Sequence, residues 1–171
     1  MSEGVHVAPN DSFGKKVGIF TAILAVLLSV FTISAHRAHT ETIKLQSVAN
    51  DQWAFYQAKR IRDDQLELNA DLLKVLAVNN VKASQLIAIY AAKHNDYVKK
   101  LQAIKTIAED KMQESQLFQQ KALLFDFAEG ILEIALVMSS LYFISRKKYF
   151  PVLGVAFATL GLIVGVFGFL Q

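Results

Sequence analysis

The chain has 171 residues, of which 53% are hydrophobic, and it contains no cysteine. The apolar residues gather in blocks, as in membrane proteins, and the lack of cysteine excludes disulfide frameworks, thiolate nucleophiles and cysteine metal sites. The net charge of +3 comes from clusters at the edges of these blocks rather than from one basic face, so we expect no nucleic-acid partner.

The amino-terminal residues 1–16 have no periodic pattern, and they predict a mobile cytoplasmic tail that ends in Lys15 and Lys16. We expect residues 17–36 to form transmembrane helix 1, because the uncharged run 17–35 covers about 28 Å at the helical rise. A cleaved signal peptide is the alternative, since Ile33-Ser34-Ala35 resembles a cleavage site. The apolar run is longer than the ~7–15 residues of a signal core, which favours a retained span.

Residues 37–121 are polar and rich in residues that favour helix, and no glycine or proline occurs between Ile19 and Glu129. The next apolar block returns the chain to the membrane, so this segment has to turn. We therefore expect a long antiparallel helical hairpin. Asn79-Asn80 lies at its midpoint, and asparagine tolerates the left-handed backbone that closes a helix, which predicts a turn at 78–84.

Both halves of the predicted hairpin carry the 4-3 repeat that is typical of a coiled-coil seam. The seam of the first half is Leu45, Ala49, Gln52, Tyr56, Lys59, Asp63, Leu66, Ala70, Leu73 and Ala77. The seam of the second half is Ala83, Ile87, Tyr90, His94, Tyr97, Leu101, Ile104, Ala108, Lys111, Ser115, Phe118 and Ala122. Polar residues in both seams predict partial hydration or pairing between the two helices.

Residues 122–145 and 150–170 predict transmembrane helices 2 and 3, joined by a turn at 146–149. The turn carries Arg146, Lys147 and Lys148, and the positive-inside rule places it in the cytoplasm. Three spans then put the amino terminus on the same side and the hairpin in the periplasm. The hairpin contains 13 Lys and Arg residues, but long domains translocate largely regardless of charge.

The run from Asn50 to Lys59, with the sequence NDQWAFYQAK, resembles the signature of an uncharacterised bacterial membrane family, domain of unknown function 4337. The stretch 125–129, FDFAE, resembles the start of that family's second span. The order of parts is similar over roughly residues 17–170. The resemblance implies the three-span architecture and no known activity, substrate or cofactor. Glu133 stands where the family often carries glutamine, which argues against an essential charge there.

Asp126, Glu129 and Glu133 are spaced by 3 and 4 residues and share one face of the second predicted span, with Glu133 near mid-membrane. A charge there costs ~2.5–3.5 kcal/mol, and each large apolar residue of the span returns only ~0.3–0.6 kcal/mol. Three ionised acids would therefore nearly cancel insertion. One interpretation is structural, with hydrogen bonds to hydroxyl groups of the first span (Ser29, Thr32 or Ser34). The other is a proton or cation path.

His36 and His39 lie at the outer end of the first span, roughly level with Asp126. Imidazole and carboxylate groups at one height are possible ligands for a divalent metal. Two histidines near a headgroup layer are more often interfacial residues, so we predict no bound metal or cofactor.

Small residues repeat along two of the predicted spans, and such stripes let helices approach closely in lipid. The stripe of the first span is Gly18, Ala22, Ala25 and Ser29, and that of the third is Gly154, Ala158, Gly161, Gly165 and Gly168. We expect these stripes to pack helices, with part of their surface left for neighbouring copies.

An aromatic and basic cluster lies on the first arm of the hairpin. Its members include Trp53, Phe55, Tyr56 and Arg60. Trp, Tyr and Arg are typical anchors of protein interfaces, so a contact between subunits is one expectation and a solvated helix face is the alternative.

The sequence thus predicts an all-α protein with three transmembrane helices and a long extramembrane helical hairpin. We expect a homo-oligomeric inner-membrane scaffold or an accessory subunit of a larger complex, in contact with the lipid bilayer. No nucleophile–base pair or phosphate loop in the sequence suggests an enzyme. The alternative is a small oligomeric proton or cation channel or transporter that uses the acidic face. The direction of that face separates the two, because a shared axis favours conduction and contact with the first span favours structure.

Overall fold

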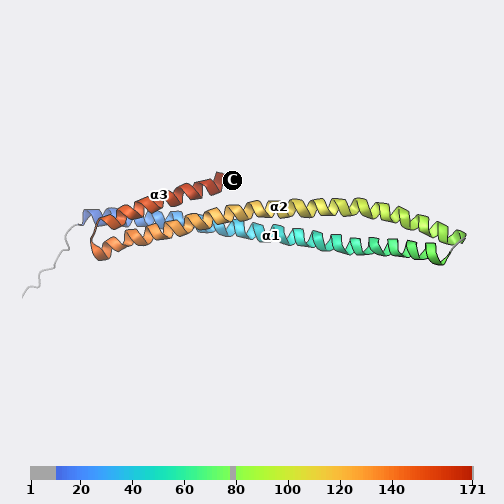
Figure 1. Cartoon of the computed structure of the whole chain (residues 1–171). Helices are drawn as coiled ribbons and strands as arrows, with labels where there is room; N and C mark the ends of the chain where they lie inside the picture. The colour runs from blue at the N-terminus through green and yellow to red at the C-terminus, as the bar shows by residue number, and fades with distance from the viewer. Residues whose placement is uncertain (1–10, 78–79, 171) are drawn as a thin grey trace, which may run out of the picture. The chain divides into compact units, whose positions relative to one another are not determined.

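The computed structural model describes residues 11–77 and 80–170, and these form three helices (Figure 1). Helix α1 spans Ser12–Leu76, α2 spans Val81–Ser145 and α3 spans Tyr149–Leu170. The described residues contain no strand, which confirms the predicted all-α class. Each helix contains a stretch that is long and apolar enough to cross a membrane.

The chain divides into two compact units. The first, here called the apolar unit, has the described residues 11–39 and 118–170, from the start of α1, the end of α2 and all of α3. The second, here called the hairpin unit, has the described residues 40–77 and 80–117, from the rest of α1 and α2.

The apolar unit has a core in which large side chains of α1 and α2 alternate with alanines. Leu24, Phe31, Phe125 and Leu132 are buried there. Aromatic rings from all three helices meet at one end of this core. The centroids of Phe125 and Phe169 lie 4.8 Å apart, and the Phe31 centroid lies 6.3 Å from that of Phe125 and 6.1 Å from that of Phe169.

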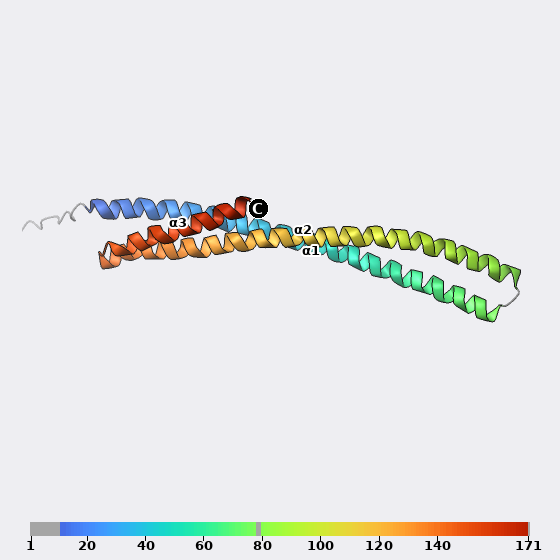
Figure 2. The same cartoon turned by 45° about the horizontal axis from the view of Figure 1, so that its top comes forward.

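In the hairpin unit, α1 and α2 run side by side in opposite directions, as both views show (Figure 2). Every described residue of the two predicted seams is buried or half-buried. Ala49 and Ala108 are completely buried, and the Ser115 hydroxyl donates to the Thr42 carbonyl at 3.3 Å. The predicted repeat therefore marks the line along which the two helices pack.

The turn of the hairpin is shorter than predicted. Residues 81–84 belong to α2, whereas we expected them in the turn, and residues 78 and 79 lie outside the described residues. The Asn80 side-chain oxygen accepts hydrogen bonds from the backbone N–H groups of Lys82 at 3.0 Å and Ala83 at 3.4 Å. Because this cap satisfies amides that lack a helical partner, α2 begins directly after Asn80.

The expected tail is also too long, because α1 begins at Ser12 rather than near residue 17. Asp11 caps the helix, since its carboxylate accepts a hydrogen bond from the Gly14 N–H at 2.8 Å. Residues 1–10 lie outside the described residues. The sequence signal for this start was present, namely an aspartate just before the helical run.

Candidate functional site

Two of the three predicted intramembrane acids bond to α1 within the apolar unit. The Glu129 carboxyl lies 2.7 Å from the Thr32 hydroxyl, and the Asp126 carboxyl lies 2.9 Å from Nε2 of His39. Both members of the second pair are nearly half exposed. The two contacts join α1 to α2 at successive levels. The first uses Thr32, one of the hydroxyl partners that the structural interpretation named, whereas Asp126 pairs with His39 instead.

The Thr32 hydroxyl has a second acceptor, the Leu28 carbonyl at 3.0 Å. A hydroxyl carries one hydrogen and two lone pairs, so it cannot donate fully to both oxygens. The single Thr32 hydrogen is therefore shared between the Leu28 carbonyl and the Glu129 carboxyl.

Glu133 differs from the other two acids. It is exposed, and no hydrogen bond or ion pair joins it to another residue within 11–77 and 80–170. The Thr32–Glu129 contact sets the register of the antiparallel helices, so Ser29 comes level with Glu133 about one turn further along. Ser29 is also exposed, and its hydroxyl donates to the Ala25 carbonyl at 2.9 Å.

The small residues of the first span have this same exposed character. Ala22, Ala25 and Ser29 are exposed, and Gly18 is half-buried with only the Phe143 ring near the position of its missing Cβ. These three exposed α1 residues and the exposed Glu133 of α2 are here called, together, the small polar face (Ala22, Ala25, Ser29 and Glu133).

By contrast, all five small residues of the α3 stripe are buried inside the apolar unit. A Cβ on Gly154 would overlap the Ser139 hydroxyl, and a Cβ on Gly165 would overlap the Phe31 ring. A Cβ on Gly161 would lie 3.0 Å from Leu132 Cγ. The expectation that part of this stripe is left for neighbouring copies is therefore wrong for α3, because α1 and α2 already cover it.

A family model described as Domain of unknown function (DUF4337) matches residues 13–171. The chain belongs to this family. The match spans both units of the DUF4337 chain and carries no activity in its description. Neither curated proteins nor solved structures gave a match.

The two candidate histidines of this DUF4337 protein do not gather with other ligands around one position. His39 pairs with Asp126, and His36 is exposed. No group of three or more His, Asp or Glu side chains in the described residues could hold an ion. Metals in structural sites generally take four ligands, so the His39–Asp126 pair alone does not make one.

The aromatic and basic cluster splits between the inside and the outside of the hairpin unit. Trp53 and Tyr56 are half-buried, with ring centroids 5.6 Å apart. Phe55 is 52% exposed, and Nζ of Lys59 lies 4.8 Å from its ring centroid. Arg60 Nε bonds to Asp64 at 3.0 Å, and that hydrogen bond raises the pKa of Arg60. Phe55 and Arg60 are thus the outward members of this cluster.

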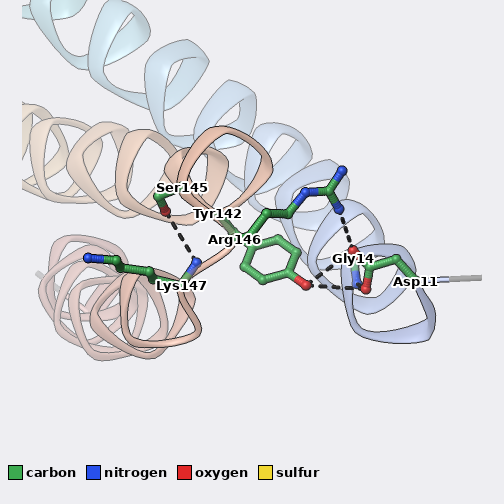
Figure 3. Close-up of polar contacts among 6 residues, drawn as sticks. All are labelled: Asp11, Gly14, Tyr142, Ser145, Arg146 and Lys147. Carbon is green, nitrogen blue, oxygen red and sulfur yellow. Dashed lines mark hydrogen bonds and ion pairs between the residues drawn. The ribbon is translucent and has the colours of Figure 1, made fainter. Parts of the chain in front are cut away.

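A polar cluster that the sequence analysis missed joins the start of α1 to the end of α2 (Figure 3). The Asp11 carboxylate accepts hydrogen bonds from Arg146 at 2.7 Å and from the Tyr142 hydroxyl at 3.1 Å. The Gly14 N–H is the main group that lowers the pKa of Asp11, and Tyr142 and Arg146 lower it further. Residues 11 and 146 are too distant in sequence for this contact to be read from spacing.

Arg146 also ends α2. Its φ of 58° is left-handed, and its N–H bonds to the Tyr142 carbonyl at 2.8 Å. Helices commonly end at a residue in the left-handed conformation, which is usually glycine; here that residue is arginine. The basic residues between α2 and α3 are therefore exposed in a tight connection, next to an anchored α1 start.

Proposed function

We propose that the protein is a multi-pass scaffold or accessory subunit of the bacterial inner membrane, which assembles from several copies and has no enzymatic activity. The observation that supports this is the exposed Glu133, without a described partner, on an apolar helix. An acid near the bilayer centre is costly unless a polar group faces it, at ~2.5–3.5 kcal/mol on insertion scales. A neighbouring copy would supply that group.

The small polar face suits such a contact. Ala22 and Ala25 would let a second helix approach closely, and such close packing is one of the sources of helix association in lipid. Because the Ser29 hydroxyl already donates to Ala25, its lone pairs are open to a donor. A neutral Glu133 from the next copy is such a donor.

The proposed orientation places the amino terminus and the connection between α2 and α3 in the cytoplasm and the hairpin unit in the periplasm. Its support is the run Arg146-Lys147-Lys148, together with Lys15 and Lys16. A Lys82→Cys variant should react with an impermeant thiol reagent in intact spheroplasts. Labelling that requires lysis would reverse the orientation.

Single cysteines test the assembly directly, because the natural chain has none. Ser29→Cys on the small polar face should form disulfide-linked dimers in oxidised membranes. Ile163→Cys is the matched control, since Ile163 is 54% exposed on α3 and lies outside the proposed contact. Equal cross-linking at both positions, or none at Ser29, would contradict the proposal.

A proton or cation path remains the second candidate, and Glu133 alone supports it because Asp126 and Glu129 bond to α1 of the same chain. Wild type and Glu133→Gln should be compared in liposomes that carry a pH gradient. The scaffold proposal expects equal, background leakage from both. Dissipation by wild type that Glu133→Gln abolishes, with the native mass unchanged, would favour conduction.

A further inference from the structure

A second seven-residue repeat lies on α1 of the hairpin unit, two residues after each seam member from Gln52 to Leu73, and it begins after Ser47 and Asp51, which are polar. It is here called the outer stripe and consists of Ala54, Ala58, Ile61, Gln65, Leu68, Leu72 and Val75. All seven are exposed, with Ile61 at 58%, Leu68 at 60% and Val75 at 74%. Two residues rotate a helix by roughly 200°, so the outer stripe lies on the side opposite α2.

The corresponding positions of α2 show that this stripe is not a general property of the hairpin. They are also exposed, but they mix apolar residues (Ile89, Ala92, Ala103 and Leu117) with polar and charged ones (Gln85, Asp96, Lys99, Thr106, Asp110 and Gln113). A hairpin whose outer sides both faced only water would be expected to carry polar residues on both helices. One arm therefore presents an almost continuous apolar row and the other a mixed row.

We propose that the outer stripe pairs with the outer stripe of a second copy, in parallel and in register. Apolar residues at alternating spacings of 4 and 3 form the seam along which a second helix packs in a coiled coil. This inference rests on the proposed assembly in one membrane, because copies with a common orientation present α1 running in the same direction. The mixed outer side of α2 offers no continuous apolar row, so α1 meets α1.

Gln65 supports the pairing of identical stripes. It is the polar residue of an otherwise apolar row. It occupies heptad position a, since the next member, Leu68 at position d, follows three residues later. In a parallel, in-register pair the two Gln65 side chains face each other. An amide has both donors and an acceptor, so the two satisfy one another, and one polar pair at this position fixes register.

The residues beside the stripe are compatible with this arrangement. In parallel pairing, each residue of one flank faces the residue five positions later on the other copy. The resulting pairs are Gln57 with Arg62, Asp64 with Asn69, and Asp71 with Leu76. No like charges meet in these three pairs. The two acids are also held within their own helix, Asp64 by Arg60 at 3.0 Å and Asp71 by Lys74 at 2.7 Å.

The decisive experiment uses Gln65→Cys in the full-length chain, in native membranes under mild oxidation. The expected product is a disulfide-linked dimer of this chain. Ala92→Cys is the matched control. It is also exposed and lies level with Gln65, because Asp63 pairs with His94, but it is on the outer side of α2. Cross-linking at Ala92 equal to that at Gln65 would overturn the proposal.

A second variant tests whether the apolar row makes the contact. Leu68→Lys with Leu72→Lys should lower the Gln65→Cys dimer yield at least tenfold, and both side chains are exposed enough that the single chain should still fold. An unchanged yield would overturn the proposal. A Gln65→Cys adduct with a different protein, identified by mass spectrometry, would overturn the choice of a second copy.

The Ser29→Cys dimer separates this inference from the proposed function. Dimers at Ser29 without dimers at Gln65 would overturn only the paired outer stripes. Absence of dimers at both Ser29 and Gln65 would overturn the proposed assembly as well as the paired outer stripes. The Leu68→Lys/Leu72→Lys variant should keep its Ser29→Cys dimers, because the substitutions leave the small polar face intact.

Discussion

The apolar unit and the hairpin unit use the same two helices but hold them together differently. In the apolar unit, α3 lays its glycines directly against Phe31, Phe125, Leu132 and Ser139, so contact depends on the absence of side chains. In the hairpin unit, contact depends on a seam of mixed residues, many of them half-buried. We therefore expect added side-chain volume to destabilise the apolar unit most. In the hairpin unit, the loss of a polar partner should be the more damaging change.

The largest effect is expected from Gly165→Leu in the apolar unit. Even a Cβ at this position would overlap the Phe31 ring, which is itself packed against Phe125 and Phe169. Overpacking costs ~1–3 kcal/mol and more when nothing can move, so the midpoint of thermal unfolding in detergent should fall.

Gly130→Ala is the matched control for Gly165→Leu, because nothing lies within 4 Å of the position of its Cβ. Alanine favours helix over glycine by ~1 kcal/mol, so this variant should be neutral or slightly more stable. A similar loss in both variants would contradict the idea that close contact, rather than helix composition, limits the apolar unit.

The next effect is expected in the hairpin seam, where the Asp63 side chain is 7% exposed and bonds to Nδ1 of His94 at 2.8 Å. His94→Leu leaves a buried acid without its partner and should cost ~1–3 kcal/mol of unfolding free energy. The double variant Asp63→Leu/His94→Leu should recover most of this loss, because it removes both partners. Additive losses would show that the two residues act independently.

A smaller effect is expected from Trp53→Ala. Full burial would predict a loss of ~3–5 kcal/mol, but Trp53 is half-buried, so about half of that is expected. Its fluorescence should peak at a shorter wavelength than that of tryptophan in water. Emission typical of free tryptophan would mean that the ring does not pack in the hairpin unit.

The smallest effect concerns the cluster around Asp11. The folded pKa of Asp11 lies below its ordinary value of 3.8, so its contribution is complete above pH 3.8 and is lost as the pH falls through the folded pKa. Hydrogen exchange of the Gly14 amide should therefore accelerate, after correction for intrinsic rates, in acid. Asp11→Asn can still cap the helix, so it should slow this loss and remove its pH dependence. Retained pH dependence in Asp11→Asn would assign the effect to another group.

The all-α class and the seams were readable from the sequence, because helix composition and a 4-3 repeat are local properties. Every described seam residue from Leu45 to Ala122 is buried or half-buried, as the spacing required. The helix ends were read less well. Asn80 and Asp11 act through side-chain caps, which shift an end by several residues without changing the surrounding composition.

The sequence by itself determined which stretches form helices, apart from their ends, and which faces carry small, acidic or apolar groups. Only the tertiary structure decided which of these faces are already covered. It buried the α3 glycines, bonded Glu129 to Thr32 and Asp126 to His39, and left Glu133 and the outer stripe exposed. The physical reason is that spacing defines a face of one helix, whereas coverage depends on the rotation of each helix against its neighbours, which many distant contacts set together.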